Sequence, residues 1–198
     1  MSEKYFSAKK ITGLAVLLAL VIVLQALGGY FKIGGTSLSF VLVPIVLGAI
    51  LYGPLAGAIL GFAFGVVVWI YGLTGADGFT AILLADHPIW TTVLCLGKGT
   101  AAGAAAGWTF RLVSKKNAYV GTFAAAVVTP VVNTGLFILG ALVMSGTLKA
   151  NFVDGTSVIY FLVVVCAGIN FLVELAINLV CSPAVYTVIR VVSKGKIK

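Results

Sequence analysis

Long apolar runs, separated by short polar or glycine-rich connections, dominate the pattern of this 198-residue chain. A helix needs about 20 mainly apolar residues to cross a hydrocarbon core of about 30 Å. Six runs approach this length, and they cover residues 11–28, 38–52, 54–73, 89–113, 119–144 and 157–180. The pattern therefore predicts an all-α integral membrane protein, in which residues 1–198 form a single domain with six transmembrane helices in one bundle.

Several segments of this pattern differ from a simple spanning helix. A secretory signal is the alternative for residues 11–28, but the apolar core of such a signal usually has only 7–15 residues. Residues 38–52 are short for a full crossing, and the Tyr-Gly-Pro sequence at 52–54 predicts a tight turn into the next helix. Residues 79–85 are apolar but too short to span, so we expect them to pack over the outer mouth of the bundle. The Cys-Ser-Pro sequence at 181–183 predicts the end of the sixth helix or a kink in it.

The composition supports the membrane class. Hydrophobic residues make up 61% of the chain and charged residues only 9%, and the mean hydropathy is +1.18. A soluble domain carries roughly 25% charged residues, and a disordered chain is poor in apolar ones. Both classes are excluded.

The positions of the basic residues predict the orientation in the membrane. Ten of the thirteen Lys and Arg residues lie at segments that six crossings place on one side. These ten are Lys4, Lys9, Lys10, Arg111, Lys115, Lys116, Arg190, Lys194, Lys196 and Lys198. Because basic residues favour the cytoplasmic side, both termini are expected to be cytoplasmic. The net charge of +8 does not indicate nucleic acid as a partner, since no basic stripe interleaves with aromatic residues.

Small residues recur at intervals of four, which places them on one face of a helix. The rows are Gly53, Gly57, Gly61 and Gly65 in the third predicted helix, and Gly99, Gly103 and Gly107 in the fourth. Such rows allow helix axes to approach closely, so they predict packing inside the bundle. Ala15 and Ala19 form a shorter Ala-x-x-x-Ala pattern in the first helix. This pair serves either internal packing or docking of another membrane protein.

Lys98 and Glu174 are the charged residues that fall well inside the predicted spans. Each costs about 2.5–3.5 kcal/mol at a helix centre, so each should face the bundle interior, a partner or a ligand. At helical rise Lys98 lies about 15 Å, and Glu174 about 25 Å, from the outer end of its helix. A direct ion pair would therefore need tilt, an extended lysine or an intermediary.

Two asparagines reach a depth similar to that of Lys98, namely Asn133 and Asn170. A cation and two amides on neighbouring helices could hold a small polar ligand with a carboxylate or carbonyl group. The alternative is a network of hydrogen bonds between helices with no ligand. Glu174 would then either touch the ligand or brace the inner half of the bundle.

Aromatic residues supply further candidates for substrate contact. Tyr30 lies in the first outer loop, residues 28–37, whose glycine, aromatic and hydroxyl residues suit either a mobile lid or an ordinary connection. Trp90 lies near the outer end of the fourth helix. Phe31, Phe137 and Tyr160 could also supply stacking.

The sequence contains no pattern that indicates an enzyme. There is no Walker A sequence, no Gly-x-Ser-x-Gly and no His-Glu-x-x-His, and the chain has one histidine and five acidic residues. The three cysteines lie in apolar runs without metal-ligand spacing. No catalytic residue, metal site or cofactor is predicted.

Three stretches follow each other along the chain, after the Ala15 and Ala19 pair: VPIVLGA at 43–49, YGPLAG at 52–57 and PVVNT at 130–134. In this order, and with six predicted helices and a basic chain, the sequence resembles the substrate-binding S components of energy-coupling factor (ECF) vitamin transporters. The resemblance covers nearly the whole chain.

The resemblance implies a transport subunit in a prokaryotic plasma membrane, surrounded by lipid and without ATPase activity of its own. Such a subunit captures a vitamin from outside at high affinity. A transmembrane scaffold protein, met by the Ala15 and Ala19 face, and two cytoplasmic ATPases then drive its reorientation. The pocket is expected in the outer half, where Lys98, Asn133 and Asn170 lie. The embedded lysine and the asparagines favour pantothenate. Two other classes stay open: a proton-coupled secondary carrier with Glu174 as the coupling acid, and a structural membrane subunit.

Overall fold

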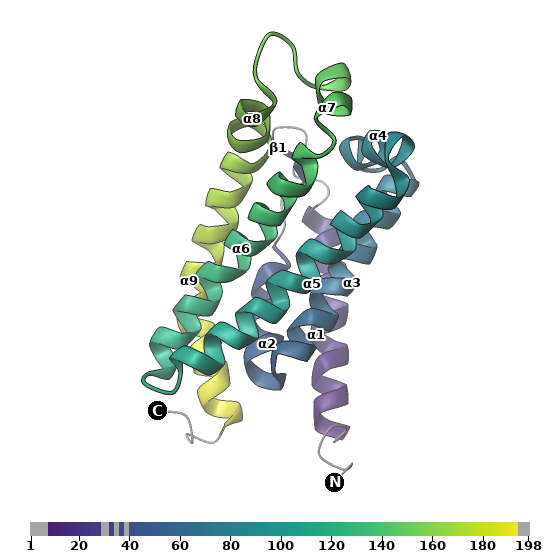
Figure 1. Ribbon diagram of the computed structural model, residues 1–198. Coiled ribbons are helices and arrows are strands. Elements are labelled where there is room, and N and C mark those ends of the chain that lie inside the picture. The colour runs from purple at the N-terminus through teal and green to yellow at the C-terminus, as the bar shows by residue number, and fades with distance from the viewer. Residues whose placement is uncertain (1–7, 29–31, 34–35, 38–39, 194–198) are drawn as a thin grey trace.

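The computed structural model describes residues 8–28, 32–33, 36–37 and 40–193, and this part of the chain is almost entirely helical (Figure 1). The elements are α1 (Ala8–Gly28), β1 (Lys32–Ile33), β2 (Thr36–Ser37), α2 (Leu42–Tyr52), α3 (Pro54–Leu73), α4 (Gly78–Asp86), α5 (Pro88–Val113), α6 (Ala118–Leu142), α7 (Ser145–Asn151), α8 (Val158–Tyr160), the π-helix η1 (Phe161–Gly168) and α9 (Ile169–Val192). The predicted single helical domain covers all of these elements.

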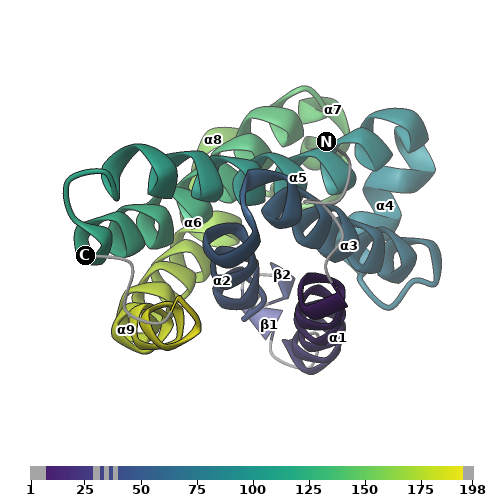
Figure 2. The ribbon, with the colours of Figure 1, turned by 90° about the horizontal axis from the view of Figure 1, so that it is seen from below.

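The long helices form one bundle with two distinct ends. The start of α1 and the end of α9 lie at the same end, and α4, α7 and α8 lie at the opposite end (Figure 1). Seen along the bundle, α2 lies between α1 and α9, with α3, α5 and α6 above it in this view (Figure 2). The short α2 therefore occupies a central place, in contact with all five of these helices. An even number of crossings would explain this arrangement of the helix ends.

Four stretches of the described residues are long and apolar enough to cross a membrane: Lys10–Gly28, Pro54–Leu73, Ala118–Leu142 and Val158–Val192. The helix α5 has 26 residues, but it is rich in glycine, alanine and threonine and contains Lys98. The helix α2 has only 11 residues. The described residues thus form a membrane helical bundle, and six crossings remain a prediction for α2 and α5.

The glycine rows pack α3 directly against α5, as predicted. A Cβ on Gly57 or Gly61 would fall less than 3 Å from the backbone oxygen of Gly103 or Gly99, respectively, and the reverse substitutions would clash in the same way. The two helices also share the most extensive contact in the bundle. Because the two backbones are in direct contact, this pair of helices is stabilised by close van der Waals packing at small residues rather than by large side chains.

The helix α1 presents different residues to its two sides. Leu17, Val21 and Gln25 are buried against the bundle. Ala15 and Ala19 lie on the exposed face. Of the two sequence-based interpretations of the Ala-x-x-x-Ala pattern, packing inside this bundle is therefore wrong, and the pair is free to meet another surface.

The end of the bundle opposite the start of α1 and the end of α9, called the outer end here after the predicted orientation, is closed by short helices. Phe79 and Leu83 of α4 belong to one buried cluster with Leu148 of α7, Val158 of α8 and Leu162 of η1. The expectation that residues 79–85 pack over the mouth is confirmed. The helix α7 was not predicted, and α6 ends at Leu142, two residues before the predicted end of that span.

The last helix differs from the prediction in length and in form. It continues through Pro183 to Val192, so of the two alternatives predicted for residues 181–183 an end of the helix is wrong, and a kink stays a prediction. Two hydroxyl groups near Pro183 bind backbone carbonyls of the same helix. Ser182 Oγ donates to Asn178 O over 2.7 Å, and Thr187 Oγ1 donates to Pro183 O over 2.8 Å. Further out, the helix adopts π geometry over Phe161–Gly168, a rare form that often lies near functional sites.

The first outer connection contains the antiparallel pair β1 and β2, in which Lys32 pairs with Ser37 and Ile33 with Thr36. The sequence pattern did not predict strands here. Tyr30, the predicted contact residue in this loop, lies outside the described residues.

Candidate functional site

Lys98 lies three turns into α5, half-buried, between α3 and α6. Its Nζ is 5.6 Å from the ring centroid of Phe64 and 5.2 Å from that of Phe137. Both distances fit cation–π interactions, which stabilise a desolvated ammonium by about 2 kcal/mol or more. Among the described residues no carboxylate forms an ion pair with Lys98, and none accepts a hydrogen bond from it. The ammonium group is therefore held by two phenyl rings, while its N–H groups have no acceptor from the described chain.

The two rings come from different helices. Phe64 is only 1% exposed, and the close packing at Gly61 and Gly65 brings its turn of α3 against α5. Phe137 comes from α6. Sequence reasoning named Phe137 as one of several aromatic candidates and missed Phe64. The sequence pattern around a phenylalanine in an apolar helix is the same whether its ring packs in the core or against a cation.

Phe137 also begins an aromatic cluster toward the outer end. Its ring centroid is 5.9 Å from that of Phe79 on α4, and Phe79 is 5.0 Å from Phe152. Phe152 in turn stacks on Phe161 of η1 at 5.9 Å. Through Phe137, which contacts the Lys98 ammonium, these four rings connect the site to the short helices at that end of the bundle.

Asn133 of α6 lies at a depth similar to that of Lys98, about 14 Å from the outer end of its helix at 1.5 Å per residue. It is 5% exposed, and its buried Oδ1 has no hydrogen-bond partner among the described residues. Pro130 lies one turn earlier in the same helix and cannot donate to the carbonyl of Ala126. A buried carbonyl without a donor costs about 1–3 kcal/mol, which is offset when a ligand donates to it.

The predicted polar stripe on the last helix is buried. Asn170, Glu174 and Asn178 are 8%, 5% and 3% exposed. The amide of Asn170 donates to Cys166 O over 3.2 Å, and that of Asn178 donates to Glu174 O over 2.8 Å. Both of these hydrogen bonds lie within one helix, so the interpretation of a hydrogen-bond network between helices stays a prediction.

Glu174 and Lys98 do not form an ion pair. None of the hydrogen bonds between described residues ends on the Glu174 carboxylate. The difference in depth between the two charges stays a prediction.

Trp90 lies apart from this group. Its Nε1 donates to Gly140 O of α6 over 2.9 Å, and the residue is 41% exposed. The indole N–H therefore ties the outer end of α5 to α6 and is not free for a substrate. Only the partly exposed face of the ring remains for the predicted contact.

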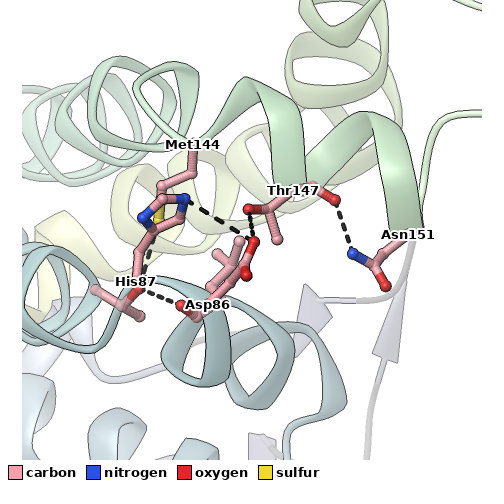
Figure 3. A network of polar contacts seen from close by, with 7 residues as sticks. Asp86, His87, Met144, Thr147 and Asn151 are labelled. Carbon is pink, nitrogen blue, oxygen red and sulfur yellow. Dashed lines mark hydrogen bonds and ion pairs between the residues drawn. The ribbon is translucent and has the colours of Figure 1, made fainter.

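A second polar network joins the short helices at the outer end (Figure 3). Thr147 of α7 donates to Oδ2 of Asp86, the last residue of α4. His87 Nε2 lies 4.0 Å from the same oxygen, and Asn151 Nδ2 donates to Thr147 O over 3.0 Å. Sequence reasoning placed His87 as a loop or cap residue, and it does cap α4 through its backbone N–H to Leu83 O. The network fastens α4 to α7.

Ionisable and amide residues in the interior of a bundle of apolar helices mark a candidate functional site of a membrane protein, and the class of membrane transport proteins follows from a comparison of sequences. Within this class, a family model described as "ECF transporter, substrate-specific component" matches residues 9–186, and the chain belongs to that family. No curated protein and no solved structure matches the chain. The resemblance stated from the sequence is thus confirmed. The chain is a substrate-binding transport subunit whose family works with a scaffold and ATPase subunits.

Proposed function

We propose that this S component captures a small solute with a carboxylate group, a B-type vitamin and by preference pantothenate, from the outside at high affinity. The solute binds in the outer half of a bundle that crosses the membrane six times with both termini in the cytoplasm. A transmembrane scaffold and two cytoplasmic ATPases then drive its release inside. Ala15 and Ala19, exposed on α1, supply the surface that meets the scaffold.

This proposal rests mainly on the groups that surround the Lys98 ammonium. Its ammonium lies between Phe64 and Phe137 and has no acceptor among the described residues. Placing a lysine inside a membrane bundle costs several kcal/mol unless a partner compensates for the lost hydration. A carboxylate from the solute would pair with the ammonium and receive a charge-assisted hydrogen bond.

The surrounding groups favour a particular kind of acid. The buried Oδ1 of Asn133 accepts hydrogen bonds, so it suits a hydroxyl or amide N–H of the solute. The rings of Phe64 and Phe137 suit an aliphatic body. Pantothenate combines a carboxylate, hydroxyl groups, an amide and branched methyl groups, which supports its choice over a flat aromatic vitamin.

Mass spectrometry of the small molecule that copurifies with the detergent-solubilised chain tests this function most directly. We expect a vitamin carboxylate, and pantothenate added to the ligand-free protein should raise its melting temperature. Uptake into proteoliposomes should require the scaffold and both ATPases. Uptake by the chain alone would instead identify a secondary carrier. If no vitamin binds at all, the proposed receptor function is wrong.

A further inference from the structure

Basic residues gather at the end of the bundle where α9 ends, opposite the outer end. Lys115 and Lys116 lie in the turn between α5 and α6, and Arg190 lies in the last turn of α9. All three are exposed, and none of them forms an ion pair within the described part of the chain. The acidic residues of the described ranges lie at the outer end or inside the bundle, and they are Asp77, Asp86, Asp154 and Glu174. The positive charge of this surface is therefore not compensated by the described chain.

Two tyrosines connect the start of α6 to the last turns of α9. The ring centroids of Tyr119 and Tyr186 are 5.2 Å apart, and the rings meet edge to face. Lys115 and Lys116 precede Tyr119 by four and three residues. Arg190 follows Tyr186 by four residues, which places the two on one face of α9, about 6 Å apart along its axis. The three basic residues therefore lie around one aromatic pair.

Close packing fixes this arrangement of the helices. Phe110 of α5 belongs to one buried cluster with Val185 and Ile189 of α9. A Cβ on Gly121 of α6 would lie 3.1 Å from the backbone nitrogen of Ser114, so the turn between α5 and α6 packs tightly against the start of α6. The basic residues are thus mounted on a rigid frame, which lowers the entropic cost of binding a ligand between them.

Apolar residues continue this surface toward the middle of the bundle. Val120 of α6 and Val188 of α9 are 51% and 42% exposed. Tyr119, which lies next to Val120, is 43% exposed. Tyrosine side chains in membrane proteins favour the level of the lipid headgroups, because the ring is apolar and the hydroxyl polar. The surface thus combines positive charge, aromatic rings and exposed aliphatic groups.

We propose that this surface binds one anionic phospholipid, whose phosphate lies among the basic side chains. The residues that form the surface are Lys115, Lys116, Arg190, Tyr119 and Tyr186. Lysine and arginine donate charge-assisted hydrogen bonds to a phosphate, and basic residues close to a membrane attract anionic lipids. The exposed valines suit the acyl chains, which a soluble anion lacks. The inference concerns a lipid and does not depend on which solute the protein transports.

Native mass spectrometry of the full chain in detergent tests the proposal, with phosphatidylglycerol and phosphatidylcholine of the same acyl chains as probes. The wild type should retain phosphatidylglycerol about tenfold more strongly, or better. The variant Lys115→Gln/Lys116→Gln/Arg190→Gln should lose this preference. The matched control Lys115→Arg/Lys116→Arg/Arg190→Lys keeps the number of charges and should keep the preference. Lys149→Gln, which removes an exposed lysine at the outer end, should also keep it.

The same measurement shows which results overturn the proposal. Equal retention of the two lipids by the wild type would do so, and so would an unchanged preference in the neutral triple variant. Displacement of phosphatidylglycerol by an equal concentration of inorganic phosphate would identify a site for a soluble anion instead. Arg190→Gln alone provides a second, milder variant, which should reduce the preference several-fold.

An acidic surface on the scaffold or the ATPases is the alternative occupant. In that case the neutral triple variant would retain both lipids like the wild type but would fail to copurify with those subunits, and the lipid proposal would be wrong. Loss of the lipid preference with normal copurification is the result that we expect.

Discussion

Gly61 of α3 and Gly99 of α5 face each other, and the backbone oxygen of each occupies the space that a Cβ on the other would need. The same kind of contact occurs one turn nearer the start of α3, between Gly57 and Gly103. Since Lys98 directly precedes Gly99, the contact also fixes the height at which Lys98 meets Phe64 of α3. Close helix packing and the candidate site are thus parts of one arrangement.

Substitution of Gly61 by valine should destabilise the bundle. The new side chain would meet backbone, which cannot rotate away, and overpacking of this kind costs about 1–3 kcal/mol. We expect the melting temperature in detergent to fall by several degrees. Gly97→Ala is the matched control on α5, because a Cβ at Gly97 meets nothing within 4 Å. A Gly61→Val variant as stable as Gly97→Ala would contradict the described packing.

Removal of the Lys98 ammonium should weaken binding of a carboxylate solute. We expect Lys98→Ala to lower the affinity for pantothenate by tenfold or more, which corresponds to about 1.4 kcal/mol. Isothermal titration of the detergent-solubilised protein would measure it. Lys149→Ala, which removes an exposed lysine from α7, should bind like the wild type. Equal affinities for both variants would remove Lys98 from the site.

Larger side chains on the exposed face of α1 should impair transport without changing the affinity for the substrate. Ala15→Leu together with Ala19→Leu should abolish uptake in vesicles that contain the scaffold and ATPases, because small residues let two helices approach closely. Pantothenate affinity should not change, since both alanines point away from the bundle. Val16→Leu changes a neighbouring position that is 62% exposed and should transport normally. Full uptake by the double variant would show that this face does not couple to the scaffold.

Loss of the Thr147 hydroxyl should loosen the outer end of the bundle. Thr147 donates to Asp86 across the junction of α7 and α4, so Thr147→Val should increase the rate of amide hydrogen exchange in Gly78–Asp86 several-fold. Thr74→Val is the control, because the Thr74 hydroxyl donates only within α3, to Ile70 O and Tyr71 O. Equal exchange rates in the two variants would show that the Asp86 contact does not hold α4.

The features that the sequence predicted well are those that depend on one helix at a time. Apolar length predicted α1, α3, α6 and most of the last helix, and the four-residue glycine spacing predicted the faces that pack. The burial of Asn170 and Glu174 followed from the cost of placing them in lipid.

The features that the sequence did not predict depend on how helices are rotated against each other. The contact of Lys98 with Phe64 and the hydrogen bond from Trp90 to Gly140 O each join two helices at a particular angle. No periodicity in one helix encodes that angle. The helix α7 escaped prediction because Ser145–Asn151 is short and contains few apolar residues, and its contacts with Asp86 and the outer cluster help to hold it in place.

The π-helical turns of Phe161–Gly168 make the last span tolerant of a one-residue deletion. A π turn accommodates a residue more than an α turn, so deletion of one residue there would let the helix resume ordinary winding. The helix on either side of the deletion would keep the face that it now presents, because the residue removed is the one that the wide turns hold in excess. Leu162 would stay in the buried cluster that contains Phe79, and Asn170 would stay buried. Homologous chains that are one residue shorter at this point should therefore carry their inward-facing amides on the same face as this chain.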